Sequence, residues 1–206
     1  MRQQSRILAT GFMLFLGAAA VHAQTFVSTL SAAAENPPTA STASGSTTVI
    51  LDTGAHTLRV IANFSGLTTG TTASHIHCCV AVPPGNGNVG VATMTPSFVG
   101  FPLGVTSGSM DQTYNTLNAA TWNAPFIAAN GATPAGAEAA LASGLRNGTA
   151  YLNLHTTMFP GGEIRGFLLA GPTGFLVPTL SQSVIGVLAL LLLVAAGWVL
   201  VRRRRA

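Results

Sequence analysis

GSTTVILDTGAHTLRVIANFSGL, residues 45–67, contains two runs in which apolar and polar residues alternate, with a short turn between them. Alternation with a period of two is typical of strands that bury one face. In the second run Arg59 and Asn63 fall on one face, and the other face is apolar, with Leu58, Val60, Ala62 and Phe64. The turn, residues 53–55, includes a glycine, which favours a tight reversal. The stretch therefore predicts a β-hairpin.

Short runs of the same kind recur on both sides of this hairpin. Bounded by proline and glycine turns, they predict strands over 25–32, 74–82, 89–94, 104–115, 149–156 and 162–170. Residues 135–148 differ, because they are rich in alanine and end in Gly148, which indicates a short helix. Many short strands with one small helix indicate an all-β fold, an antiparallel β-sandwich. We expect residues 24–170 to form this single domain.

The first 23 residues have the layout of a secretory signal peptide. A basic start with Arg2 and Arg6 precedes an apolar run over 7–21, and small residues end the segment at Ala23. Such a run is short for a membrane span and suits the apolar part of a signal peptide. We expect residues 1–23 to direct export and to be removed.

Residues 184–201 are uncharged and largely apolar, and the arginine-rich residues 202–206 follow at once. A helix of this length extends about 27 Å, which is sufficient to cross the hydrocarbon core of a membrane. Arginine clusters favour the cytoplasmic side. The sequence thus predicts a transmembrane helix over 184–201, a cytoplasmic tail over 202–206, and a domain held in the periplasm or at the cell surface.

The formal net charge of +4 comes from the two ends of the chain. Between them lie three arginines and five acidic residues, a net charge of −2, and the chain has no lysine. This composition argues against nucleic acid as a partner, since such a face needs clustered cations. The acidic residues are widely spaced, and no standard catalytic motif is present, so we expect no enzyme activity.

SHIHCCV, residues 74–80, sets His75, His77 and Cys79 on one face of an expected strand. A His-x-His pair on a strand can present two imidazoles to one copper or zinc ion. Two ligands rarely suffice, and His155 is the third candidate. Alternatively, the histidines only brace the strands by hydrogen bonds to backbone or carboxylate groups.

Two further polar residues are expected on the same side of the domain. In the last strand Glu163 and Arg165 share a face opposite Ile164, and the short turn after His155 brings them close to that histidine. One polar wall could therefore collect all three histidines with these two residues. Glu163 and Arg165 are expected to form a structural ion pair.

Cys78 and Cys79 are the only cysteines in the chain. Thiols outside the cytoplasm tend to oxidise, but adjacent residues of a regular strand point to opposite faces, so a disulfide between them needs a local distortion. Three states stay open: a vicinal disulfide, two reduced thiols with Cys79 near the histidines, or pairing between molecules.

The histidine strand, the turn after it and the segment LASGLRNGTAYLNLHTTMFPGGEIRGFL, residues 141–168, resemble a CHRD domain. This module is repeated in the animal regulator chordin and occurs singly in bacterial exported proteins. The resemblance implies an extracellular all-β domain, of immunoglobulin-like or superoxide-dismutase-like architecture, that serves binding or structure rather than catalysis. The family more often has Gly-Pro where this chain has Cys78-Cys79.

Residues 171–183 form a linker that carries a short motif, Val177, Pro178, Thr179, Leu180 and Ser181. With the following helix and arginines, this motif resembles the IPTL-CTERM class of bacterial sorting signals, which are relatives of PEP-CTERM. The resemblance implies an exosortase-type membrane enzyme as a partner that removes or exchanges the helix. Otherwise the helix is a simple anchor.

The sequence as a whole predicts an exported, membrane- or surface-anchored CHRD-domain protein with a non-enzymatic role. Its expected partner is an extracellular polymer or protein. The alternative is an extracytoplasmic copper- or zinc-binding or redox protein centred on His75, His77 and His155. The second hypothesis predicts that the protein binds a metal tightly and that replacing those histidines removes it. The first hypothesis does not predict this.

Overall fold

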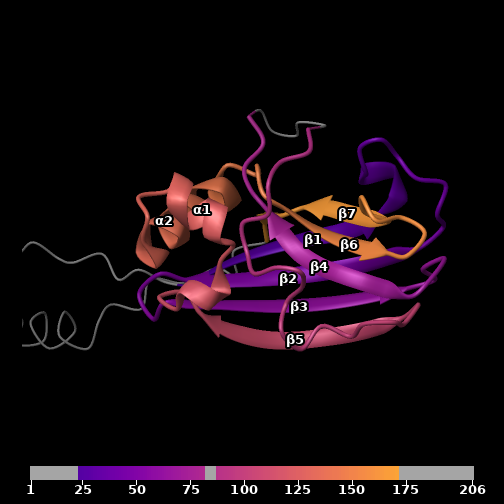
Figure 1. Cartoon of the computed structure of the whole chain (residues 1–206), viewed down its shortest axis with the longest axis horizontal. Helices are drawn as coiled ribbons and strands as arrows, with labels where there is room; N and C mark the ends of the chain where they lie inside the picture. Colours follow the sequence, from indigo (N-terminus) through magenta and orange to yellow (C-terminus); the bar gives the residue numbers. More distant parts are fainter. Residues whose placement is uncertain (1–22, 82–86, 172–206) are drawn as a thin grey trace, which may run out of the picture. The chain divides into compact units, whose positions relative to one another are not determined.

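One curled antiparallel sheet organises residues 23–81 and 87–171, the part of the chain described by a computed structural model (Figure 1). The strands are β1 (Gln24–Ser31), β2 (Ser44–Asp52), β3 (Thr57–Ser65), β4 (Thr71–His77), β5 (Gly108–Asn115), β6 (Tyr151–Thr156), β7 (Ile164–Phe167) and β8 (Leu169–Ala170). Their order is β4-β6-β7-β1-β2-β3-β5, and β8 pairs with β1 beside this path. The predicted signal peptide, linker, sorting motif, transmembrane helix and arginine tail lie outside the described residues.

The hairpin predicted over 45–67 is confirmed as β2 and β3, which pair antiparallel along their whole length. Asp52 Oδ1 accepts hydrogen bonds from the backbone N–H groups of Gly54 and Ala55, both at 2.9 Å, and so forms the turn. The apolar side chains of β3 are buried as their alternation predicts. On the outer face Arg59 donates two hydrogen bonds to Asp111 of β5.

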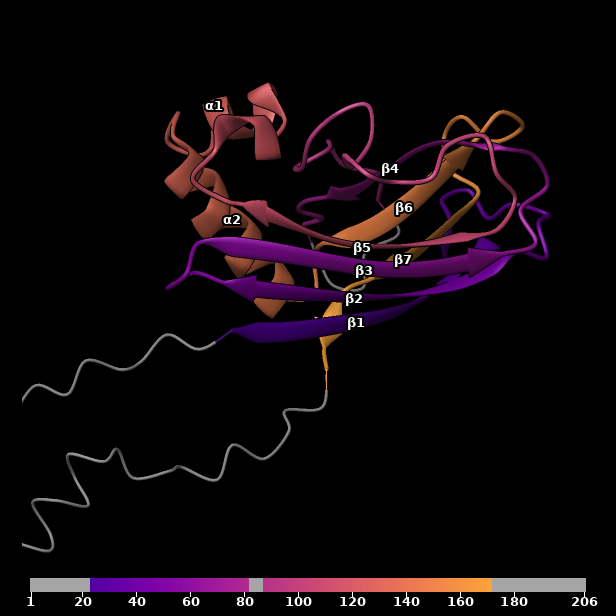
Figure 2. The same cartoon turned by 90° about the horizontal axis from the view of Figure 1, so that it is seen from below.

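The prediction of a mostly β, antiparallel domain is confirmed, but the two walls of the expected sandwich belong to one sheet. Figures 1 and 2 show β4, β6 and β7 across from β2, β3 and β5. β1 joins the walls, since it pairs with β2 on one side and with β7 and β8 on the other. Because strands twist, one sheet can curl until its inner face encloses a core. Side-chain alternation is the same in a curled sheet and in a two-sheet sandwich, so the sequence pattern does not distinguish them.

Two short helices, α1 (Ala124–Ala129) and α2 (Pro134–Arg146), lie at one end of the curled sheet (Figure 2). The predicted helix corresponds to α2. Thr133 caps it by accepting a hydrogen bond from the Gly136 N–H, and Gly148 follows its end with a φ of 65°.

The sequence did not predict α1, nor the 3₁₀ turns η1 (Ala32–Ala34) and η2 (Ala119–Thr121). No helix of the described residues is both long and apolar enough for a membrane span.

The strand predicted over 89–94 forms only isolated bridges, from Val91 to His77 and from Thr93 to Trp122. A side chain interrupts the ladder, because the Thr93 hydroxyl accepts the hydrogen bond of the Ile76 N–H at 2.9 Å. The segment therefore lies beside β4 without extending the sheet. Its position matters for the histidines described below.

Glu163 is fully buried and joins three distant segments of the chain. Its Oε1 accepts hydrogen bonds from the hydroxyls of Ser41 and Thr68 and from the Thr68 N–H, at 2.6 to 2.9 Å. Its Oε2 accepts from the Thr156 hydroxyl at 2.6 Å. Burial acts to raise the pKa of Glu163, but these hydrogen bonds outweigh it and hold the pKa below its usual value. The carboxylate is therefore a charged structural centre.

Replacing this carboxylate by an amide, in Glu163→Gln, should lower the free energy of unfolding by about 2 to 3 kcal/mol near pH 7, because charge-assisted hydrogen bonds are lost. A lowered folded-state pKa stabilises the fold above the unfolded-state pKa, and this contribution disappears as the pH falls through the folded value. Urea unfolding should show the difference from wild type shrinking below about pH 5. Asp111→Asn, in the exposed pair with Arg59, should change the free energy of unfolding far less, because water and salt screen this ion pair. A pH-independent cost at Glu163 would contradict the prediction.

Candidate metal centre

The three candidate histidines lie together on the paired strands β4 and β6. The register sets Ala73 opposite His155 and His75 opposite Asn153, so His155 is the diagonal neighbour of His75. One ligand nitrogen from each of His75, His77 and His155 lies within 4.8 Å of the other two. His75 and His155 are buried, and His77 is partly buried. The group could hold a metal ion.

Each ring is fixed by a backbone carbonyl. The carbonyl oxygens of Pro96, Val89 and Pro160 lie 3.1, 2.7 and 2.9 Å from the Nδ1 atoms of His75, His77 and His155, respectively. A carbonyl oxygen can only accept, so each Nδ1 carries the hydrogen. In the neutral ring this leaves the lone pair on Nε2, the arrangement that second-layer carbonyls give to metal-binding histidines.

Within residues 23–81 and 87–171, the Nε2 atoms of the three rings have no adequate partners. Those of His75 and His155 are 2.9 Å apart, and the buried Nε2 of His77 has no hydrogen-bond partner in this part of the chain. Two lone pairs that face each other at hydrogen-bond distance repel unless a proton or a cation lies between them. A metal ion that accepts all three lone pairs would satisfy these atoms together, and imidazole is a ligand for both zinc and copper.

Protonation is disfavoured at all three rings. Burial, then the nearby His155 and His77, lower the pKa of His75 to about 3. Burial lowers the pKa of His77 to about 4, with smaller contributions from His155 and Arg165. Burial also lowers the pKa of His155. The rings are therefore neutral near pH 7, and a metal ion would displace no protons from them.

A second layer of side chains supports His77. Its ring lies parallel to that of Tyr151, with the centroids 4.7 Å apart. Arg165 lies beyond Tyr151, with its Cζ 4.7 Å from the centroid of that ring. The guanidinium also donates to Asn88 Oδ1 at 2.7 Å and to the Ala34 carbonyl. The Tyr151 hydroxyl accepts a hydrogen bond from the Val89 N–H, so the same side chains hold the segment that fixes His77.

The predicted ion pair between Glu163 and Arg165 does not form. Arg165 faces Glu35, with Nε and Oε2 3.9 Å apart, and the carboxylate of Glu163 is surrounded by hydroxyl groups. Side chains two residues apart share a face, but each is drawn to the nearest group of suitable chemistry. Burial raises the pKa of Glu35 to about 7, although Arg165 acts to lower it. Sequence reasoning missed Glu35, because nothing in its neighbourhood marks it as buried.

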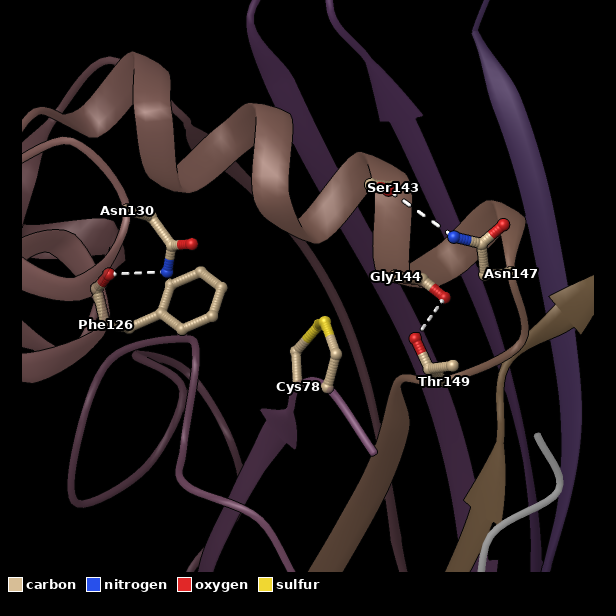
Figure 3. The surroundings of a disulfide bond; sticks show 8 residues. Cys78, Phe126, Asn130, Ser143, Gly144, Asn147 and Thr149 are labelled. Carbon is tan, nitrogen blue, oxygen red and sulfur yellow. Dashed lines mark hydrogen bonds between the residues drawn. A yellow bond between two sulfur atoms is a disulfide. The ribbon is translucent and has the colours of Figure 1, made fainter. Parts of the chain in front are cut away.

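The two cysteines form a vicinal disulfide, one of the three states that the sequence left open. Figure 3 shows the disulfide facing α2 near Gly144 and Thr149. A Cβ atom at Gly144 would overlap both sulfurs, so only glycine lets the helix approach this closely. Cys79 Sγ therefore lies against α2, and not with the histidines as in the reduced alternative.

A family-wide model of the CHRD domain matches residues 26–168. The chain belongs to the CHRD domain family. The match includes all three histidines, both cysteines, Glu163 and Arg165, so the candidate metal centre lies inside the CHRD domain. No curated protein and no solved structure matches the chain.

In this CHRD domain, Gly144→Ala should lower the free energy of unfolding by about 1 to 3 kcal/mol, because the new methyl group overlaps the disulfide. The same change should be neutral or mildly stabilising in a Cys78→Ala/Cys79→Ala background, since alanine favours a helix over glycine by about 1 kcal/mol. Urea unfolding of the four proteins forms a double-mutant cycle. Additive effects would contradict a contact between Gly144 and the disulfide.

The metal-free CHRD domain should also be sensitive to acid. Because the folded-state pKa values of the histidines lie below the unfolded value of about 6.5, the unfolded chain takes up more protons as the pH falls. We expect chelator-treated protein to lose about 1 to 2 kcal/mol of unfolding free energy for each of His75 and His77 between pH 7 and pH 5. His75→Ala/His77→Ala should weaken this dependence, and an unchanged slope in that variant would contradict the assignment.

Proposed function

We propose that this CHRD domain binds one copper or zinc ion outside the cytoplasm through His75, His77 and His155. One observation carries the proposal. Three backbone carbonyls fix the hydrogen on Nδ1, and one ligand nitrogen from each ring lies within 4.8 Å of the other two. Bracing alone would account for the Nδ1 hydrogen bonds, but it does not account for two Nε2 atoms in contact and a third without a partner.

The proposed role is binding rather than catalysis. The buried carboxylates of the described domain are occupied elsewhere: Glu35 lies beside Arg165, Glu138 faces Thr116 and His56, and Glu163 accepts hydrogen bonds from hydroxyl groups. General acid–base chemistry at a metal needs such a group within reach of the reacting atoms. The arrangement suits storage or transfer of an ion, or stabilisation of the fold by it.

The proposed location rests on the two ends of the sequence. Residues 1–23 have the layout of a signal peptide, and residues 184–206 have that of a membrane helix with a cytoplasmic arginine tail. We include membrane anchoring in the proposal, with the VPTLS motif as a substrate for an exosortase-type enzyme. A vicinal disulfide also suits an oxidising compartment.

A second candidate function is binding of an extracellular polymer. A shallow hollow on the sheet is lined by hydroxyl and amide side chains, among them Thr29, Ser46, Asn63, Ser65 and Ser109. Such groups can exchange hydrogen bonds with sugar hydroxyls, which favours a polysaccharide. This face could bind a polymer whether or not a metal is present.

The full chain, exported to the periplasm of a bacterial host without a histidine tag, should carry about one copper or zinc ion. The reason is that three neutral imidazoles in fixed geometry bind such ions tightly. Elemental analysis should find less than about a tenth of this metal in His75→Ala/His77→Ala. His56→Ala is the matched control, because His56 pairs with Glu138 and lies outside the group of three. Failure of the wild type to bind either ion, or equal metal in both variants, would refute the proposed function.

A further inference from the structure

The group of three histidines contains no anionic ligand. Among residues 23–81 and 87–171, no fourth His, Cys, Asp or Glu joins the group. The cysteines that could have supplied thiolates are bonded to each other and face α2. A bound ion would therefore keep its whole charge inside the protein, unless a small anion entered with it.

The surroundings do not offset such a charge. The guanidinium of Arg165 is almost fully buried, and its Cζ lies 4.7 Å from the centroid of the Tyr151 ring, on which His77 also stacks. The four hydrogen-bond donors around Glu163 already stabilise its negative charge. Glu35 lies beside Arg165, and burial favours its neutral form. An ion at the histidines thus gains little from neighbouring charges and meets a buried cation two side chains away.

The cost of burying an ion grows with the square of its charge in the Born description, so a divalent ion costs about four times as much as a monovalent one. Zinc, in addition, almost always takes four ligands and needs an open position for the last. His75 and His155 are only 7% and 8% exposed, and Tyr151 and Asn153 beside them are buried, which leaves little room for solvent. A closed-shell monovalent ion that accepts three ligands suits this site better.

We propose that the ion held by His75, His77 and His155 is monovalent copper, Cu(I), bound by three neutral imidazoles without an added anion. This inference rests on the proposed function. The proposed function allows copper or zinc, and the inference specifies Cu(I). No electron transfer is part of the proposal. The ion binds and leaves as Cu(I).

Competition experiments on the full chain under anaerobic conditions test the proposal. Bicinchoninate competes for Cu(I), and a chromophoric zinc chelator competes for Zn(II). We expect the dissociation constant for Cu(I) to be at least about a thousandfold lower than that for Zn(II), and X-ray absorption to show three nitrogen ligands at Cu(I). Zinc binding equal to or tighter than that of Cu(I) would overturn this inference and leave the metal centre in place. Binding of neither ion would refute the proposed function itself.

A variant that adds a negative charge beside the histidines tests whether the absence of an anionic ligand causes the preference for Cu(I) over Zn(II). Asn153 lies opposite His75 in the register, and its buried Oδ1 has no hydrogen-bond partner. Asn153→Asp keeps the shape of the side chain and adds a negative charge next to the site. We expect it to reduce the preference for Cu(I) over Zn(II) at least about tenfold, whereas Asn118→Asp, an exposed residue just before η2, should leave it unchanged. An unchanged preference in a folded Asn153→Asp variant would overturn the electrostatic argument.

Discussion

The antiparallel register between β4 and β6 is the constraint on which the candidate site depends. It sets Ile76 opposite Leu152, with both side chains in the core, and therefore fixes which residues occupy the other face. A shift by one residue would exchange the two faces and bury the histidines among leucines. The core thus specifies the register, and the register brings His75 and His155 together. The candidate metal centre follows from apolar packing on the opposite side of the same two strands.

Three loops then orient the imidazoles of this candidate site. The carbonyls that accept from Nδ1 belong to Pro96, Val89 and Pro160, and each lies outside the sheet. Two of them are prolines, which have no N–H group and whose carbonyls pair with no neighbouring strand here. The sheet fixes the positions of the rings, and the loops determine which nitrogen is free. Arg165 and Tyr151 extend this control, since both hold the segment that contains Val89.

Alternation and helix signals predicted part of the local structure, although α1 was missed and the strand predicted over 89–94 forms only isolated bridges. They located the β2–β3 hairpin, the buried face of β3, helix α2 and the shared face of the three histidines. They could not show that the sheet curls on itself, because closure depends on twist and on the double pairing of β1 and not on the residues of any single strand. They also misassigned Glu163 and Arg165, whose partners Ser41, Thr68 and Glu35 come from loops more than 90 residues away in the sequence. Long-range partners of buried charges leave no local pattern.

The histidine strand has two interpretations, strand bracing and metal binding, and they concern different nitrogens of the same rings. Bracing concerns Nδ1, and metal binding concerns Nε2. A structural histidine that braces a strand needs one good hydrogen bond, and each of the three makes it through Nδ1 to a backbone carbonyl. Were bracing the whole role, Nε2 would be expected to face solvent or a donor, and burial would otherwise cost free energy. Here the Nε2 atoms of His75 and His155 face each other at 2.9 Å, and the buried Nε2 of His77 has no hydrogen-bond partner among the described residues. The bracing bonds are therefore compatible with a metal site and would orient its ligands. The missing hydrogen-bond or metal partners of the three Nε2 atoms are the physical reason to expect an ion between them.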